Sequence, residues 1–473
     1  MTTPLWSQTE LIAALGVAPS AALRAPVNGV SIDTRTLQPG DLFFAIKGES
    51  SDGHDYVERA FAAGAAACVV AAQRRSALAD LGPLFAVDDP LRAMERLGVA
   101  ARARSRARIV AVTGSVGKTS AKEMLRLMLS KTGATHASVA SYNNHWGVPL
   151  TLARMPADAA FAVFEIGMNH SGEIAPLAAM VRPHVALITT IAPVHIEHLG
   201  SLEAIAEAKA EILSGLEPKG VAVLNRDAPH YDLLEARARA FGAKVISFGA
   251  DEEAHAKLLR CDGLDGGARV RACIGVGELS FALGAPGVHM AHNALGALLA
   301  AKALGADLLV SAAALAEFAP PKGRGERFTL ETPSGPIVLI DESYNANPAS
   351  MRAALALLGA AEPGKGGRRI AALGDMLELG AHGHSMHAEL VEALKSARVD
   401  RLFCAGPLVR ALFDAAPAHV RAAWAPDAAA LEPDLTEALR GGDVVMIKGS
   451  NGSRMGPLAA SLRQHFARAQ ASV

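Results

Sequence analysis

A glycine-bearing turn followed by a lysine and a threonine is the strongest chemical signal in the sequence. The run IVAVTGSVGKTSAKEML predicts an apolar strand at residues 109–112, a tight turn, and a helix that opens at Lys118. Backbone N–H groups in such a turn bind phosphate, the lysine reaches the terminal phosphate oxygens, and the hydroxyl of Thr119 binds Mg²⁺. Val112 stands where the usual G-x-x-x-x-G-K-T pattern has its first glycine, so Gly114 provides a shorter version. The predicted phosphate loop consists of Thr113, Gly114, Ser115, Val116, Gly117, Lys118 and Thr119.

The sequence favours ATP over GTP as the bound nucleotide. GTP-binding proteins read guanine with an N-K-x-D motif after a later strand, and the nearest match is Asn225-Arg226-Asp227, which has the wrong spacing and no lysine. A chance Gly-Lys-Thr in a surface turn is the alternative to a nucleotide site. The strand and helix on either side of the turn argue against that alternative.

Two polar residues follow apolar strands downstream of the phosphate loop. Glu165 ends the run FAVFE, and His195 comes after VALITTI. Open α/β sheets bind ligands at the carboxyl ends of their strands, and a metal beside a nucleotide is placed by more than one protein group. We therefore expect Glu165 and His195 to join Thr119 at a magnesium site. An ordinary surface or core histidine is the alternative for His195.

Lys209 occupies an unexpected position for a charged residue. The run SLEAIAEAKAEIL at residues 201–213 predicts a helix whose apolar stripe includes Leu202, Ile205 and Ile212, and Lys209 lies on that stripe. An apolar setting lowers the pKa of a lysine, and only the neutral amine is a nucleophile. The alternative is a lysine whose stem lies along the stripe while its ammonium group reaches water.

These residues must be positioned by a folded chain of several domains. The length and composition of the sequence are typical of such a chain. The 473 residues exceed the size of one hydrophobic core, and 51% hydrophobic against 20% charged residues is typical of globular proteins. With 46 Lys and Arg against 47 Asp and Glu, the net charge of −1 gives no general attraction to nucleic acid or to anionic membranes. Four scattered cysteines, an N-terminus without signal-peptide features and no bilayer-length apolar run predict a cytoplasmic protein.

The chain divides into three predicted domains, all of the α/β class. Residues 1–105 contain three short apolar strands and form a small α/β unit. Residues 106–322 begin with the phosphate-loop strand and alternate strands with helices, which predicts a mainly parallel sheet covered on both faces. Residues 323–473 show the same alternation and predict a smaller Rossmann-like domain. The segment PPKGRGER at residues 320–327 has the composition of a linker.

Eight segments resemble, in their order, motifs of the ATP-dependent Mur ligases. They are TGSVGKTSAKEM, YNNHWGVPLTL, FEIGMNHSGEI, HIEHLGS, EAKAEI, HMAHNALGALLAA, DESYNANPASM and LGDMLELG, and together they extend over nearly the whole chain. The last two are similar to the members that add D-alanyl-D-alanine rather than to the family at large. The resemblance implies a monomeric cytoplasmic enzyme that uses ATP to join D-alanyl-D-alanine to UDP-N-acetylmuramoyl-tripeptide, with the N-terminal domain holding the UDP-sugar.

The resemblance also implies roles for the charged residues around the phosphate loop. The lysine of the family's K-x-E motif is carbamylated by CO₂, which here implies a carbamate on Lys209. Two Mg²⁺ ions would be held by Thr119, Glu165, His195 and that carbamate. The implied catalytic residues are Lys118, Glu165, His195 and Lys209.

Further residues are implied in nucleotide and substrate binding. Asn293 and Asp341 would contact the nucleotide, together with Arg324 or Arg327. Ordinary surface charges and an Asn-rich turn are the alternatives for parts of the substrate set. That set consists of Ser31, Asp33, Thr34, Arg35, Lys47, Gly48, Asn143, Asn144, Asn345 and Asn347.

The implied reaction has two steps, and two other classes of protein are alternatives to this interpretation. The tripeptide carboxylate attacks the γ-phosphate of ATP, and the dipeptide amine then displaces phosphate from the acyl phosphate. A sister ligase or a folylpolyglutamate synthase would add a single amino acid, and the D-N-P-R motif of the diaminopimelate-adding sister is absent. A P-loop regulatory switch would give no role to the third domain or to Lys209. Trp146 and His198 depart from the usual family residues close to the substrate motifs.

Overall fold

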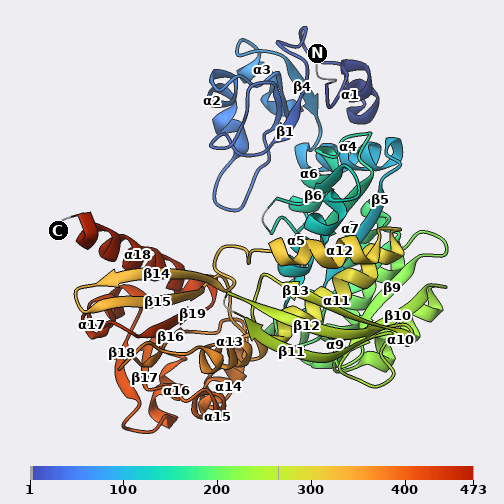
Figure 1. Cartoon of the computed structure of the whole chain (residues 1–473). Helices are drawn as coiled ribbons and strands as arrows, with labels where there is room; N and C mark the ends of the chain where they lie inside the picture. Colours follow the sequence, from blue (N-terminus) through green and yellow to red (C-terminus); the bar gives the residue numbers. More distant parts are fainter. Residues whose placement is uncertain (1–3, 140, 265, 472–473) are drawn as a thin grey trace.

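The computed structural model describes residues 4–139, 141–264 and 266–471, and these residues form three separate β-sheets (Figure 1). Sheets of four, nine and six strands follow one another along the chain. Figure 1 shows each sheet in its own α/β body, with the N-terminal and C-terminal bodies at different ends of the central one. The predicted three-domain α/β fold is therefore confirmed. The domain boundaries near residues 105 and 322 stay predictions.

The N-terminal body is a parallel sheet in the order β1-β2-β3-β4. Every side chain of β2 and β3 is buried, which is why both strands read as continuous apolar runs. The first strand ends at Ser31, so Asp33 and Arg35 lie in the turn that follows it rather than in a strand. The elements are α1 (Gln8–Leu15), β1 (Gly29–Ser31), β2 (Asp41–Phe44), η1 (Gly53–Tyr56), α2 (Val57–Ala62), β3 (Ala67–Ala71), η2 (Ala72–Arg74), α3 (Arg75–Leu78), β4 (Leu84–Val87) and α4 (Pro90–Arg104).

The central body is built on nine strands in the order β13-β12-β11-β10-β9-β8-β5-β7-β6. Strands β5 to β11 run parallel, as the alternation of strands and helices predicted. The elements are β5 (Arg108–Thr113), α5 (Lys118–Ser130), β6 (Thr135–Ala137), α6 (Gly147–Ala153), β7 (Phe161–Glu165), α7 (Ile174–Val181), β8 (Val185–Ile188), α8 (Ile196–Leu199), α9 (Leu202–Ala210), η3 (Glu211–Gly215), β9 (Val221–Asn225), α10 (Tyr231–Ala240), β10 (Lys244–Gly249), β11 (Ala256–Leu264), β12 (Gly267–Ile274), β13 (Gly277–Leu283), α11 (Val288–Ala303), α12 (Leu308–Ala314) and η4 (Leu315–Glu317).

Strand β5, which lies between β8 and β7, supplies side chains to two hydrophobic cores. Val110 and Val112 point to the core that α5, α11 and α12 cover, whereas Ile109 and Ala111 point to the core under α6, α7, α9 and α10. This alternation follows from the two-residue repeat of a strand that is buried on both faces. The phosphate loop is thus attached to the most enclosed strand of the sheet.

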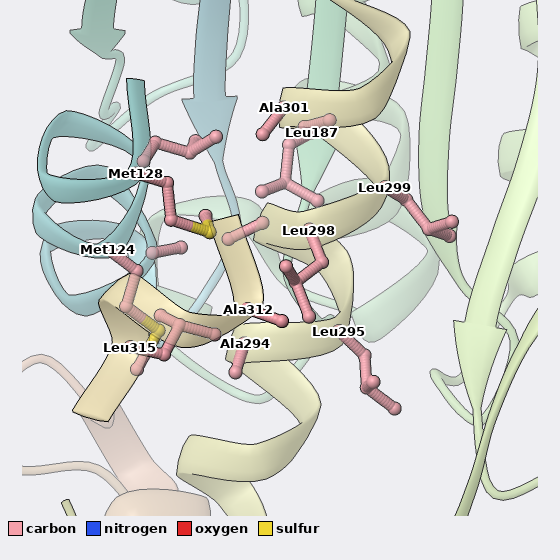
Figure 2. Close-up of a cluster of buried hydrophobic side chains, with 14 of the residues drawn as sticks. Met124, Met128, Leu187, Ala294, Leu295, Leu298, Leu299, Ala301, Ala312 and Leu315 are labelled. Carbon is pink, nitrogen blue, oxygen red and sulfur yellow. The ribbon is translucent and has the colours of Figure 1, made fainter. Parts of the chain in front are cut away.

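Helix α11 fills the space between the sheet, α5 and α12. Figure 2 shows Leu298 of α11 on the side of the helix nearer Met128 of α5, with Leu187 of β8 close by, and all three are fully buried. Alanines at neighbouring positions let the helices approach closely, because they add little volume. This packing fixes the helix that carries Asn293 against the helix that begins at Lys118.

Two parts of the central body differ from the sequence-based expectation. Strand β12 pairs antiparallel with β11, and β13 pairs antiparallel with β12, two hairpins that the sequence did not reveal. The predicted helix at residues 201–213 ends at Ala210 and continues as a 3₁₀ turn, η3. Because a 3₁₀ turn has three residues per turn, Ile212 and Leu213 still reach the core while Lys209 closes the α-helix.

The C-terminal body has a six-stranded sheet in the order β14-β15-β19-β16-β17-β18. Only β14 runs antiparallel to its neighbour. Strand β14 begins at Glu326, so the end of the predicted linker, including Arg327, belongs to the sheet instead. The elements are β14 (Glu326–Thr332), β15 (Gly335–Glu342), α13 (Pro348–Ala360), β16 (Arg369–Gly374), η5 (Gly380–His382), α14 (Gly383–Ala388), α15 (Val391–Ser396), β17 (Arg401–Ala405), α16 (Arg410–Ala415), β18 (Arg421–Ala425), α17 (Ala428–Ala438), β19 (Val444–Lys448), η6 (Asn451–Ser453) and α18 (Met455–Ala471).

Candidate active site

The phosphate loop joins β5 to α5 through two glycines with positive φ. Gly114 has φ +141° and Gly117 has φ +86°. A Cβ atom on Gly117 would lie 2.4 Å from Oδ1 of Asn293, and one on Gly114 would lie 2.0 Å from Oγ1 of Thr189. Glycine is therefore required at both positions by conformation and by close approach.

Lys118 lies at the first position of α5 and folds back over the loop. Its Nζ donates to the carbonyl oxygen of Gly114 at 2.8 Å. Burial lowers the pKa of Lys118, and the nearby carboxylate of Glu165 opposes that shift. The ammonium group is thus held at the turn where backbone N–H groups meet phosphate.

A cavity of about 290 Å³ opens next to the phosphate loop and is lined by two domains. The central domain contributes residues 115–120 together with Thr189, Thr190, Asn225, His289, Met290, His292 and Asn293. The C-terminal domain contributes Gly323, Arg324, Glu342, Tyr344, Asn345, Asn347, Ala349, Ser350, Ala353, Ala354 and Lys448. The structure thereby brings Asn293, Arg324, Asn345 and Asn347, all expected from the sequence, to one cavity with the phosphate loop.

The structure separates the two arginines that the sequence left as alternatives. Arg324 lines the cavity, with its guanidinium 4.1 Å from the ring centroid of Tyr344. Arg327 lies on β14 and lines a different cavity. Asp341 is absent from the cavity wall, because its buried Oδ1 accepts hydrogen bonds from the backbone N–H and hydroxyl of Ser343. Arg324 is therefore the arginine that lines the cavity next to the phosphate loop, whereas Arg327 and Asp341 do not line it.

Glu165 ends β7 beside the phosphate loop and is almost fully buried. Its Oε1 accepts a hydrogen bond from Nδ2 of Asn143 at 2.8 Å. Its Oε2 has no hydrogen-bond partner among the described residues. A buried carboxylate oxygen without a partner is costly unless a ligand or metal occupies it, so this atom marks a binding position.

Lys209 is buried with 2% of its surface exposed. Within the described part of the chain its ammonium group makes no hydrogen bond or ion pair. Burial lowers the pKa of Lys209 well below its ordinary value, and the positive charge of Lys118 lowers it further. This burial favours the neutral, nucleophilic amine over the ammonium form.

His195 precedes α8 in the left-handed conformation, with φ +54°. Its Nδ1 is in ion-pair contact with a carboxylate oxygen of Glu378 from the C-terminal domain, although the contact does not have hydrogen-bond geometry. Burial lowers the pKa of His195, Glu378 opposes the shift, and Lys118 and Lys209 lower the pKa further. His195 is therefore close to both lysines of the site.

The residues around the phosphate loop suit Mg²⁺. No group of three or more His, Cys, Asp and Glu side chains capable of holding a metal occurs among the described residues. Magnesium, however, is usually held by one or two carboxylates together with waters and substrate phosphates. The unpartnered Oε2 of Glu165, the hydroxyl of Thr119 and the imidazole of His195 form such a sparse donor set.

Only some of the predicted substrate-binding residues of the N-terminal domain lie against residues of the central domain. Arg35 is exposed and makes a two-pronged ion pair with Asp33, with Nη2 2.6 Å from Oδ2. Gly48 lies against Trp146 of the central domain, where an added Cβ would be 3.1 Å from Cη2. Ser31 is buried, and its hydroxyl bonds the backbone of Asp33. Thr34 and Lys47 lie in the adjoining turns.

Two predicted substrate residues also have structural roles. Oδ1 of Asn144 accepts from the backbone N–H groups of Trp146 and Gly147 at the start of α6. Asn347 caps α13 through its side chain, which accepts from the N–H of Ser350 at 2.9 Å. These caps explain part of the asparagine content of both motifs.

Several residues of the site were missed by the sequence reasoning. Lys448 is buried in the cavity wall, and its Nζ donates to the carbonyl oxygen of Asn345 at 2.9 Å. Glu342 lies 3.4 Å from the same ammonium group. Both follow buried strands, so the strand-end rule that identified Glu165 also applied to them. His198 is exposed and pairs with the ring of His170, with centroids 4.8 Å apart.

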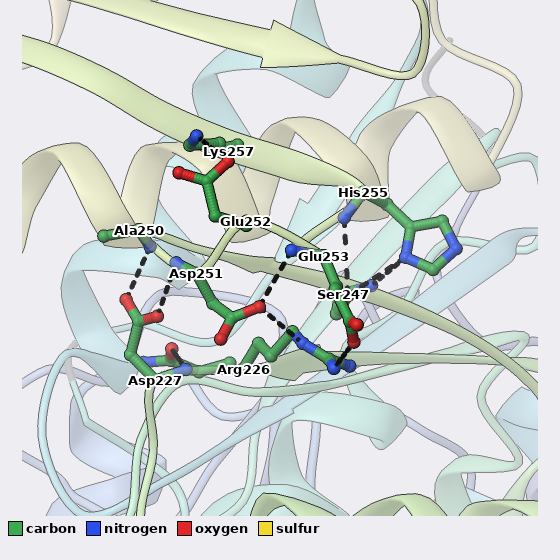
Figure 3. Close-up of polar contacts among 10 residues, drawn as sticks. Arg226, Asp227, Ser247, Ala250, Asp251, Glu252, Glu253, His255 and Lys257 are labelled. Atoms are coloured by element: carbon green, nitrogen blue, oxygen red, sulfur yellow. Dashed lines mark hydrogen bonds and ion pairs between the residues drawn. The ribbon is translucent and has the colours of Figure 1, made fainter.

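The segment at residues 225–227 supports the connection between β10 and β11 rather than a guanine base. Figure 3 shows the carboxylate of Asp227 accepting the backbone N–H groups of Ala250 and Asp251, and Arg226 paired with Asp251 and Glu253. These side chains are used within the fold. The structure therefore agrees with the absence of a guanine motif from the sequence.

Comparison with known proteins places the whole chain among one group of enzymes. Residues 26–126 match the family model described as "Mur ligase family, catalytic domain", residues 112–301 the "Mur ligase middle domain", and residues 323–451 the "Mur ligase, glutamate ligase domain". No helix in the described ranges is long and apolar enough to cross a membrane.

Similar curated proteins carry one name. UDP-N-acetylmuramoyl-tripeptide–D-alanyl-D-alanine ligase of Rickettsia prowazekii is 32% identical over 452 residues, covering 95% of this chain and 98% of that protein. The enzyme of the same name from Escherichia coli is 38% identical over 383 residues, covering 80% and 81%. The crystal structure of MurF from Acinetobacter baumannii matches with a TM-score of 0.84 and 28% identity over 98% of this chain and 100% of that one. MurF ligase from Thermotoga maritima, in complex with ADP, has the same fold with a TM-score of 0.76.

Proposed function

The chain belongs to the Mur ligase family, and from this we propose that it is an ATP-dependent ligase that joins D-alanyl-D-alanine to UDP-N-acetylmuramoyl-tripeptide. The product would be the completed peptidoglycan precursor. The dipeptide is favoured over a single amino acid because the similar curated proteins over most of the chain carry the dipeptide-adding name.

One arrangement of side chains carries this proposal. The phosphate loop lines a cavity to which the C-terminal domain contributes Arg324, and Glu165, His195 and the buried Lys209 lie close to Lys118 of that loop. An ATP-driven ligase needs such a place, because a phosphoryl group must be transferred to a carboxylate and the acyl phosphate must be kept from water. A regulatory switch would not require Lys209 or a second domain at the cavity.

The chain's own groups account for charge stabilisation in the first step. The carboxylate of the tripeptide attacks the γ-phosphorus of ATP, the bond to the β-γ bridging oxygen breaks, and ADP leaves. Lys118 and the backbone N–H groups of the loop stabilise negative charge on the transferring group. Bound Mg²⁺, held by Thr119, Glu165 and His195, would supply further charge neutralisation.

The second step needs no nucleophilic side chain. The amine of the dipeptide attacks the acyl carbon, the bond from that carbon to the phosphate oxygen breaks, and the amine loses a proton as the amide forms. Arg324 and Lys448 would keep the C-terminal domain on the nucleotide while the acyl phosphate exists. Asn345 and Asn347 face the same cavity and are our candidates for dipeptide contacts.

Carbamylation of Lys209 belongs to the same proposal. The neutral Nζ would attack CO₂, forming an N–C bond and releasing one proton, so that a cation is replaced by an anion. Burial supports this step, because it lowers the pKa of Lys209 and so increases the fraction of neutral amine. The new anion would lie near Lys118, where an ammonium group is unfavourable, and could hold a second Mg²⁺.

The remaining parts of the proposal concern the N-terminal domain, the oligomeric state of the protein and its cellular location. Residues 1–105 would hold the UDP-sugar, with Lys47 and the motif containing Asn143 as contacts. We also propose that the protein acts as a monomer in the cytoplasm, since its near-zero net charge provides no general attraction to membranes.

Phosphate release by the purified protein tests the function directly. ATP, Mg²⁺ and UDP-N-acetylmuramoyl-tripeptide are supplied with and without D-alanyl-D-alanine, and the product is weighed by mass spectrometry. We expect phosphate release only when both substrates are present. The mass of the product should be greater by one D-alanyl-D-alanine unit. Release with a UDP-linked dipeptide and a single amino acid would instead identify a sister activity. A folate substrate and glutamate test the folylpolyglutamate alternative.

A further inference from the structure

A loop of the C-terminal domain reaches across to the central domain at His195. The loop covers residues 375–380, between β16 and η5. The carboxylate of Glu378 lies against Nδ1 of His195, and the backbone N–H of Glu197 points to the carbonyl oxygen of Glu378 at 3.5 Å. A Cβ atom on Gly380 would lie 3.2 Å from Cγ of Glu197. The two domains therefore touch at the imidazole.

Apolar contacts extend this junction beyond the charged pair. Ile196, next to His195, packs against the core of the C-terminal domain, whose buried members include Met376 and Leu379 of the same loop. Ile196 also contacts the core of its own domain. One side chain thus belongs to both domains, which ties the position of His195 to the docking of the loop.

The loop is anchored within the C-terminal domain before it reaches His195. The backbone N–H of Met376 donates to Nε2 of the fully buried His387 at 2.9 Å. The N–H of Leu377 donates to the hydroxyl of Ser450 at 3.0 Å, and Oδ1 of Asp375 accepts from the N–H of Val409 at 2.7 Å. These bonds fix the loop from three sides, so Glu378 is presented in a defined place.

The backbone at the junction is unusual on both sides. Glu378 has φ +62° and His195 has φ +54°, a region that favours glycine and that other residues rarely adopt. Such conformations persist where the surrounding structure fixes them, and they are concentrated at functional sites. The conformations point the Glu378 carboxylate and the His195 imidazole toward each other across the domain boundary.

We propose that Glu378 is a positioning residue, brought by docking of the C-terminal domain, that orients the imidazole of His195 through Nδ1 and leaves Nε2 for the ligand of the site. This rests on the proposed function in one respect, namely that His195 serves the metal of an ATP-driven ligase. A carboxylate on one ring nitrogen fixes the tautomer and the orientation of a histidine whose other nitrogen binds metal. The site would then be complete only when the two domains are docked.

Three variants separate the carboxylate from the fold of the loop. Glu378→Gln keeps the size of the side chain and removes its charge. Glu378→Gly removes the side chain where positive φ suits glycine, so the loop keeps its path. Glu392→Gln is the control, because Glu392 is an exposed glutamate of the same domain that pairs only with Lys395. Circular dichroism and thermal unfolding verify that each variant is folded.

The first readout is metal affinity, which requires no turnover. Mn²⁺ binding in the presence of a non-hydrolysable ATP analogue is followed by electron paramagnetic resonance. Both Glu378 variants are expected to weaken Mn²⁺ binding about 10- to 100-fold, and the control variant to bind like the wild type. Unchanged affinity in both Glu378 variants would overturn the proposal.

A double-mutant cycle with His195→Asn provides the second readout. If Glu378 acts through the imidazole, Glu378→Gln should cost Mn²⁺ affinity in the wild type and almost none in the His195→Asn background. Additive losses would show that Glu378 acts independently and would overturn the proposal. A wild-type protein that binds Mn²⁺ but forms no dipeptide product would refute the proposed function, while the cycle would still decide the role of Glu378.

Discussion

The residue that distinguishes this site is a buried lysine without the partners that such a group normally has. Lys209 makes no hydrogen bond or ion pair within the described residues, and Lys118 lies near enough to lower its pKa. A buried cation next to another cation is unfavourable. A buried anion beside Lys118 is favourable. The electrostatic setting thus supports conversion of the amine into a carbamate and leads to two residue-scale predictions that experiments can check.

Replacement of Lys209 by alanine is expected to lower ligase turnover about 100-fold or more, because an anion near the transferring phosphoryl group and its metal is lost. Acetate or formate should restore part of the activity by entering the space that the side chain leaves. Phosphate release with and without the added carboxylate measures both effects. Lys302→Ala is the control, because Lys302 is exposed on α11. Loss without rescue would favour a structural role for Lys209.

Lys209 also predicts a pH dependence of stability. Its folded-state pKa is lowered, so between that value and about 10.4 the unfolded chain binds the extra proton and the folded chain does not. Stability should therefore rise with pH across this window and stay constant at its lower level below the folded-state pKa, where both states bind the proton. Lys209→Met should flatten this slope and stabilise the protein at neutral pH by about 1–3 kcal/mol. Urea unfolding in CO₂-free buffer at several pH values provides the measurement.

The residue scale also shows where sequence reasoning reached its limit. Glu165, His195 and Lys209 could be chosen because a strand end or an apolar stripe makes a polar residue stand out. Arg324 and Arg327 could not be separated, because they are three residues apart and only the start of β14 decides which one faces the cavity. Glu378 was missed, since its partner His195 is 183 positions away and the contact depends on how two domains dock.

At the scale of elements, the phosphate loop depends on the packing of α11 against α5. Asn293 on α11 occupies the place where a side chain on Gly117 would lie. The loop geometry is therefore set by two helices that are far apart in sequence and held together by a dense apolar cluster (Figure 2). A side chain added at Gly117 should therefore act on the loop through its contact with Asn293.

Gly117→Ala is expected to weaken nucleotide binding at least about tenfold and to destabilise the fold by roughly 1–3 kcal/mol, because the new methyl group meets the Asn293 amide at a positive φ. Gly242→Ala is a matched control: its φ is +72°, and nothing lies within 4 Å of the added Cβ. Combining Gly117→Ala with Asn293→Ala should recover stability but not affinity. Calorimetric titration with ADP and urea unfolding measure the two quantities, and equal losses for Gly117→Ala and Gly242→Ala would exclude the clash.

Most elements were predictable because they bury apolar runs or periodic stripes. Strands β5, β7 and β8 are continuous apolar segments ended by turns or polar residues, as expected of parallel strands buried on both faces. Strands β12 and β13 were missed because their exposed positions alternate with buried ones and Gly275 and Gly277 interrupt the pattern. The end of the lysine-bearing helix at Ala210 was also missed, since the apolar spacing continues into the 3₁₀ turn.

At the scale of the whole molecule, α6 joins the N-terminal domain to the central one. The indole Nε1 of Trp6 donates to the carbonyl oxygen of Ala153 at 2.8 Å, and Nε of Arg154 donates to that of Val30 at 2.6 Å. The segment before α6 carries Trp146, which touches Gly48. The domain proposed to hold the UDP-sugar is therefore connected directly to the segment that carries Asn143 and, through it, to Glu165.

Trp146→Ala is expected to raise the KM for UDP-N-acetylmuramoyl-tripeptide about tenfold and to leave the KM for ATP unchanged, because an aromatic contact of about 1.4 kcal/mol at the domain junction is lost while the nucleotide cavity is intact. Trp146→Phe should lose part of the affinity, since the contact with Gly48 is made by the distal Cη2 of the indole, which a phenyl ring does not extend to. Phe241→Ala, an exposed aromatic residue beyond α10, is the control. Initial-rate kinetics with each substrate varied in turn provide the measurement. A parallel rise in both KM values would mean that Trp146 supports the central fold. A selective rise in the KM for the sugar-nucleotide substrate would show that this substrate binds at the junction between α6 and the residue 47–52 loop.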